Sequence, residues 1–177
     1  MITIFVDKIK TLDQISYISF IDSLDFNTLT CTCGHSACLT KHAYYIRTIK
    51  SSTPDPVILT ILRVKCSHCG RTHAIVPQLI VPYSQVTLED HIEIISNHMA
   101  GNSQEQLMDR KPLIDENSIR YILHNYYKYW HQRLVAFHIS LTDSMMNLIA
   151  SCFRYLSRQF MQIKCTCNKL LCQTHIT

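Results

Sequence analysis

Two stretches in the first half of the chain have the composition of β-strands. Ala43–Lys50 and Val57–Lys65 are rich in Tyr, Ile, Thr and Val, which favour strands. The segment between them, 51–56, reads SSTPDP and consists of turn-forming residues. The pattern therefore predicts a β-hairpin, followed by a short third strand at Thr72–Val76.

Weaker patterns precede the hairpin. Residues 1–6 alternate between apolar and polar positions, which indicates an edge strand. Within 12–24, Leu12, Ile15, Ile18 and Ile21 recur at helical spacing. We therefore expect a short helix whose buried side carries these four residues.

The second half of the chain has helical periodicity. Thr87 is placed to cap a helix that ends near Gly101, and Ser103–Gln106 fits a capping box for a short second helix. Asp115 is placed to cap a long third helix, and Thr142 a fourth. The apolar stripe expected on the third helix is Ile119, Ile122, Leu123, Tyr126, Trp130, Leu134 and Phe137. The stripe expected on the fourth is Met145, Ile149, Cys152, Phe153, Leu156, Phe160 and Ile163.

Composition narrows the class of protein. With 177 residues, 47% hydrophobic and 17% charged, the chain is expected to fold as one ordinary domain or two small ones rather than remain disordered. Its apolar runs are far shorter than a membrane span requires, and its N-terminus lacks the pattern of a secretion signal. We therefore expect a cytoplasmic protein, in which nine Cys and ten His indicate metal binding before disulfides.

Two cysteine motifs flank the predicted hairpin. Residues 66–70 read CSHCG and residues 31–34 read CTCG, and each motif ends in Cys-Gly. A glycine there readily adopts the backbone conformation that such a turn needs. A zinc ribbon brings four thiolates together from two such turns, so we predict structural Zn²⁺ bound by Cys31, Cys33, Cys66 and Cys69. Cys38 is an alternative member of the first pair.

Other interpretations of the cysteines remain open. A redox CxxC favours a strand-to-helix setting, whereas Cys69 leads through Gly70 into a strand. A catalytic Cys–His pair is compatible with composition alone. Near the C-terminus a similar pattern recurs, which is either a second metal site or an unstructured end with exposed thiols: Cys165, Cys167, Cys172 and His175.

Charge is distributed in blocks. Residues 26–84 carry six basic residues against one acidic residue, and residues 117–177 carry seven against one. The segment between them, 85–116, carries seven acidic and two basic residues. Two basic blocks suggest two surfaces for a polyanion, although solvated helix faces would give the same pattern.

The predicted helices follow the order of a helix-turn-helix domain, with a short middle helix and a long, basic third one. Opposite its apolar stripe, the third helix carries residues suited to contact phosphates and base edges: Arg120, His124, Lys128 and His131. Lys41, Arg47 and Arg71 are expected to contact the DNA backbone from the ribbon. The turn at 109–114 is longer than is usual for this motif. The acidic residues of the first predicted helix are expected to lie away from DNA.

The runs CTCGHSAC, KHAYYIR and ILRVKCSHCGRTHAIVPQLIVPYSQ resemble a bacterial family of unknown function found on mobile elements. They are also similar to the N-terminal zinc ribbons of certain insertion-sequence transposases, in which a ribbon and a helix-turn-helix recognise terminal DNA. The resemblance is most specific over 31–85 and looser to about 163. It implies metal ligation by Cys31, Cys33, Cys66 and Cys69 and assigns no role to Arg63, Arg71 or His73. The family's usual glycine is Ala43 here.

These observations predict an α+β fold with a small zinc-ribbon β module at 27–82 and an all-α, helix-turn-helix-like module at 87–163. Residues 1–26 form an extension and 164–177 a Cys-rich tail. A transposase needs three metal-binding carboxylates in its catalytic domain, but Asp143 is the single acidic residue after 116. We therefore expect a non-enzymatic factor in transposition that binds double-stranded DNA, with a separate transposase subunit as a further partner. The alternative is an adaptor whose ribbon docks a partner protein.

Overall fold

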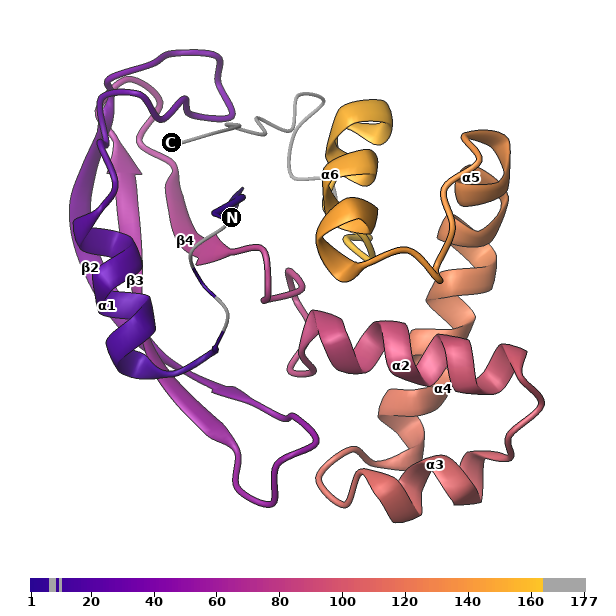
Figure 1. Cartoon of the computed structure of the whole chain (residues 1–177). Helices are drawn as coiled ribbons and strands as arrows, with labels where there is room; N and C mark the ends of the chain where they lie inside the picture. Colours follow the sequence, from indigo (N-terminus) through magenta and orange to yellow (C-terminus); the bar gives the residue numbers. More distant parts are fainter. Residues whose placement is uncertain (7–8, 10, 164–177) are drawn as a thin grey trace.

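The computed structural model describes residues 1–6, 9 and 11–163 and confirms the predicted α+β class. A four-stranded sheet with one helix against it is followed by a helical region (Figure 1). The elements of the sheet region are β1 (Ile2–Ile4), α1 (Gln14–Asp22), β2 (Leu39–Ile49), β3 (Val57–Cys66) and β4 (Thr72–Pro77).

The sheet is mixed and has the strand order β1-β4-β3-β2. β2 and β3 form the predicted antiparallel hairpin along their whole length, from the Ile49–Val57 pair to the Leu39–Cys66 pair. β4 pairs with β3 only opposite Arg63, Val64 and Lys65. β1 lies at the edge of the sheet, as expected, but it runs parallel to β4. The sheet therefore contains a strand from the segment predicted as an extension.

Tyr17 of α1 joins β3 to β4 where the two strands separate. Its hydroxyl donates to the Ile75 carbonyl at 3.0 Å and accepts from the Leu62 N–H at 2.9 Å. The hydroxyl thereby occupies the position of a missing ladder hydrogen bond and satisfies two buried backbone groups. Helix α1 is thus built into the sheet through this side chain.

The buried side of α1 differs from the predicted one. Tyr17, Phe20 and Ile21 are buried, whereas Ile15 is 82% exposed and Ile18 is 50% exposed. The stripe that we predicted on helical spacing was wrong for these two residues. The two aromatic side chains bury more apolar area than the isoleucines would, so they determine the orientation of the helix.

The helical region begins where the sequence predicts. Thr87, Ser103 and Asp115 cap helices as expected, and Ser103 forms a complete capping box with Gln106. Among the described helices, none is long and apolar enough to cross a membrane. The elements are α2 (Leu88–Met99), α3 (Gln104–Arg110), α4 (Glu116–Asn125), the π-helical η1 (Tyr126–Trp130), α5 (His131–Ala136) and α6 (Met145–Leu156).

Two predictions about the later helices were wrong. The third helix contains the π-helical turn η1, which widens the turn and rotates the residues after it. The helix then ends at Ala136, so Phe137 lies outside it, is 45% exposed and stacks on Tyr155. The fourth helix is capped by Ser144 rather than Thr142 and ends at Leu156, so the predicted stripe extends too far.

A buried ion pair connects the sheet to the helical region. The Lys111 ammonium, only 1% exposed, lies 2.5 Å from Asp90 and 2.7 Å from Glu93. It also donates to the hydroxyl of Ser52, at the tip of the β2–β3 hairpin. Burial alone raises the pKa of Asp90, but the hydrogen bonds from Lys111 and the Ser52 and Thr87 hydroxyls lower it overall. The acidic residues of α2 thus stabilise the junction between the two regions.

We expect Lys111→Met to lower the free energy of unfolding by about 3 kcal/mol, because a buried carboxylate loses its partner. Urea denaturation at neutral pH measures the effect. The difference from wild type should narrow as the pH falls, because without Lys111 the pKa of Asp90 is higher in the variant than in wild type and protonation then removes the unpaired charge. The control is Lys50→Met, which breaks the exposed pair with Asp115 and should cost less than about 1 kcal/mol. Equal losses in the two variants would contradict the prediction.

Candidate metal centre

Two tight turns position the clustered cysteines. In the first, Gly34 donates to the Cys31 carbonyl at 2.8 Å, and in the second, Gly70 donates to the Cys66 carbonyl at 2.9 Å. Both glycines have positive φ, +95° and +71°, which side chains disfavour. A backbone hydrogen bond from Ser67 to Cys38 at 2.8 Å joins the second turn to the residue that precedes β2. The glycines therefore have the role that the sequence indicated.

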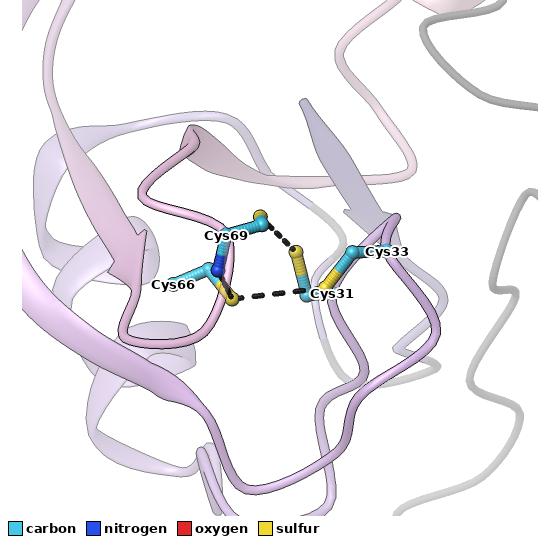
Figure 2. Close-up of side chains that lie close together, drawn as sticks. All are labelled: Cys31, Cys33, Cys66 and Cys69. Atoms are coloured by element: carbon cyan, nitrogen blue, oxygen red, sulfur yellow. Dashed lines mark hydrogen bonds between the residues drawn. The ribbon is translucent and has the colours of Figure 1, made fainter.

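Four sulfur atoms meet between the turns, from Cys31, Cys33, Cys66 and Cys69. All four lie within 4.8 Å of one another, and no other described group of three or more potential ligands forms such a cluster. Figure 2 shows the two pairs facing each other, with Cys31 and Cys69 sulfurs 3.6 Å apart and Cys33 and Cys66 sulfurs 3.8 Å apart. The cluster can bind a metal ion, and its members are the four cysteines predicted from the sequence.

The thiols differ in acidity. Burial alone raises the pKa of Cys66, but a hydrogen bond from the Cys69 backbone N–H and the hydrogen bond with the Cys38 thiol lower the pKa to about 6. Burial raises the pKa of Cys31 to about 12. A metal ion deprotonates a coordinating thiol outright, so ion binding offsets the resistance of Cys31 to ionisation.

Cys38 lies beside the cluster without belonging to it. Its buried sulfur is 3.4 Å from the Cys66 sulfur and donates to the His35 carbonyl at 3.0 Å. The sequence indicated Cys38 as the alternative ligand. In this arrangement its sulfur contacts Cys66 from outside the cluster, while Cys31 and Cys33 complete the group of four.

Three histidines surround the cluster. The Nε2 atom of buried His73 lies 3.3 Å from the Cys31 sulfur, and burial lowers the pKa of this imidazole to about 4. His35 contacts the Cys33 sulfur through Nδ1 at 3.5 Å and stacks on His68. The sequence indicates no role for His73, because its approach to Cys31 depends on the pairing of β4 with β3. A neutral His73 can donate an N–H to a metal-bound thiolate.

The residues predicted to contact DNA lie apart from the cluster. Arg120 and His124 on α4 and Lys128 on η1 are exposed along one side of the third helix, while His131 on α5 is half-buried. Arg120 pairs with Glu116 one turn earlier. The Nδ1 atom of His131 lies 3.3 Å from the Tyr126 hydroxyl. The first three residues therefore share a solvent-facing row.

The three basic residues of the sheet region that were predicted to contact the DNA backbone have different surroundings. Arg71 is exposed, and Lys41 is also exposed with its ammonium 5.4 Å from the ring centre of Phe26. The Arg47 guanidinium donates to the carbonyls of Val81 and Ser84 at 2.9 and 2.5 Å. Arg47 thus fixes the segment that follows β4, an interaction that the local sequence does not indicate.

The predicted second cluster at Cys165, Cys167, Cys172 and His175 lies outside the described residues.

A family model described as a domain of unknown function (DUF6431) matches residues 30–120, just over half of the chain. This stretch contains all four clustered cysteines and extends into α4. Comparison with curated proteins and with solved structures gave no match. The similarity to transposase ribbons therefore stays a prediction.

Proposed function

The chain belongs to the DUF6431 family, and we propose that it is a non-catalytic, zinc-containing protein that binds double-stranded DNA as a recognition or accessory factor of a mobile element. The proposal combines two features. One is the four-cysteine cluster, and the other is the exposed basic row on the third helix of the helical region. A separate transposase subunit would supply the catalytic carboxylates.

The spacing of the sulfurs supports zinc as the metal. Zinc binds thiolates at about 2.3 Å in a tetrahedron, which places the sulfurs roughly 3.8 Å apart. The separations here are 3.6 Å for Cys31 and Cys69 and 3.8 Å for Cys33 and Cys66. Four thiolates complete the coordination of the ion, which is typical of structural zinc sites. In this role the metal stabilises the turns rather than activating a substrate.

The observation that carries DNA binding is the row of Arg120, His124 and Lys128. Ile119, Ile122 and Leu123 are buried, and both α2 and α3 pack against α4, so the row lies on the side of the helix that is exposed to solvent. This is the arrangement by which a recognition helix enters the major groove. The acidic residues at the start of the helix also pair with cations, Glu116 with Arg120 and Asp115 with Lys50.

We expect Arg120→Ala combined with Lys128→Ala to weaken binding of duplex DNA of any sequence, because each cation neutralises a phosphate. Removing one such ion pair with phosphate should reduce the slope of log affinity against log salt by about 0.9. Fluorescence anisotropy with random and element-end duplexes at about 50 and 200 mM salt measures both quantities.

The matched control removes the two arginines near α6 by Arg154→Ala with Arg158→Ala, and it should retain most of the affinity. If the control pair abolishes binding while the Arg120 and Lys128 pair does not, the recognition helix is wrongly assigned. If the wild-type protein binds no duplex at low salt, the DNA-binding function is rejected.

An adaptor function is the second candidate, because an apolar patch lies on the sheet. Tyr44, Ile46 and Ile58 are 60%, 73% and 61% exposed and share the outer face of the β2–β3 hairpin. Contiguous exposed apolar residues typically mark protein-binding surfaces. Absence of duplex binding at low salt would favour this function.

A further inference from the structure

A cleft lies between the segment after β4 and the first half of α4. Its volume is about 250 Å³, and it is lined by Tyr83, Ser84, Gln85, Val86, Asn117, Ser118, Tyr121 and Ile122. A smaller cavity of about 10 Å³ adjoins it, shares Tyr83, Ser84, Tyr121 and Ile122, and reaches His91 and Asn125. The volume is below the ~300–1,000 Å³ of sites for drug-sized ligands, so the cleft suits a smaller group.

At the smaller cavity, the side-chain amide of Asn125 has an atom without a hydrogen-bond partner among the described residues. The residue is only 4% exposed, and its amide nitrogen Nδ2 has no hydrogen-bond partner among the described residues. An unsatisfied buried donor costs about 1–3 kcal/mol, so such groups are rare in folded proteins. Asn125 lines the smaller cavity and not the cleft itself, and that cavity has room for about one water molecule, so the amide can reach a ligand in the cleft through a bridging water.

Two half-exposed tyrosines line the cleft. Tyr83 is 47% exposed and Tyr121 is 51% exposed. Tyr83 has φ of +66°, a conformation that bulky residues seldom adopt, and Arg47 stabilises it by hydrogen bonds to the carbonyls of Val81 and Ser84 on either side. The backbone thus holds this ring at the cleft in a strained conformation.

The residues that line the cleft determine which chemical class of ligand it can bind. Every lining residue is polar and uncharged, apolar or aromatic, apart from His91, whose pKa burial lowers to about 4, so that it is neutral at ordinary pH. A phosphate or carboxylate would find no cation in the lining. A flat, neutral group with ring acceptors can instead stack on tyrosine, as nucleobases do on aromatic platforms, and accept a hydrogen bond from a water bound to Asn125.

We propose that the cleft binds one unpaired or extrahelical base of the DNA. The inference rests on the proposed DNA-binding function and deepens it, because Tyr121 directly follows Arg120 of the basic row. A duplex held along that row would bring its backbone next to the cleft. The protein would then distinguish DNA with an unpaired base from a fully paired duplex.

The test compares three labelled duplexes by fluorescence anisotropy: fully paired, with a single-adenine bulge, and with an abasic bulge. The wild-type protein should bind the adenine bulge at least about tenfold more tightly than the other two. Tyr121→Ala should remove this preference and leave affinity for the paired duplex nearly unchanged. Tyr121→Phe should retain the preference, because a phenyl ring stacks equally well.

Tyr155→Ala is the matched control, since Tyr155 is 49% exposed on α6 and does not line the cleft. A 2-aminopurine in the bulge gives a second measurement on the wild-type protein alone, and its emission should change on binding.

Equal affinity for all three duplexes would overturn the inference while leaving the DNA-binding function intact. Failure to bind any duplex at low salt would reject both proposals.

Discussion

Replacing Cys66 and Cys69 with serine is expected to abolish zinc binding and to unfold the turns of the sheet region. Structural zinc contributes apparent binding energies of about 10–16 kcal/mol in small modules, and this energy stabilises the folded state directly. β3 and β4 pair at only three positions near the site, so the strands alone hold the second turn weakly. We expect the free energy of unfolding to fall by more than about 5 kcal/mol.

Elemental analysis and thermal denaturation measure the two effects. Purified wild-type protein should contain one zinc per chain, and the double variant none. Cys38→Ser is the matched control, because Cys38 is buried against Cys66 but lies outside the group of four. It should keep its zinc. A double variant that retains both zinc and the wild-type melting temperature would refute the assignment, and loss of zinc from Cys38→Ser would revise the ligand set.

Trp130→Ala is expected to lower the free energy of unfolding by about 3–5 kcal/mol, the range for truncating a large buried aromatic. Trp130 is fully buried in the helical region, and its ring contacts Phe160 edge-on with centres 5.3 Å apart. The substitution leaves a cavity between the third helix and the segment after α6. Because the chain has one tryptophan, urea denaturation must be followed by circular dichroism rather than by intrinsic tryptophan fluorescence.

Phe137→Ala serves as the control for Trp130→Ala. Phe137 follows the same helix but is 45% exposed, so its truncation should cost less than about 1 kcal/mol. An unchanged midpoint for Trp130→Ala would show that Trp130 is exposed in solution. The ring would then be available to stack on a ligand.

The features that could be predicted from the sequence are those that depend on neighbouring residues. The cluster follows from two short Cys-Gly turns beside a hairpin, and the helix starts follow from Thr87, Ser103 and Asp115, whose side chains bond to backbone within three residues. These local hydrogen bonds need no knowledge of the fold.

The remaining features depend on contacts between distant segments. Parallel pairing of β1 with β4 joins residues more than seventy positions apart, and the buried pair of Lys111 with Asp90 forms only when α3 and α2 meet. His73 approaches Cys31 only once β4 is paired with β3. The π-helical turn could not be predicted for a different reason, because the spacing of apolar residues in the third helix fits a constant helical period.

The bridging hydroxyl of Tyr17 limits how the chain can be divided. A fragment restricted to the family-matched stretch, 30–120, would lack β1 and α1 and would leave the Leu62 N–H and the Ile75 carbonyl without their partner. It would also open the edge of β4 that β1 covers, and open edges of sheets promote association between chains. The boundary of the family match therefore does not delimit an autonomous folding unit, and the N-terminal segment belongs to the same cooperative structure as the cysteine turns.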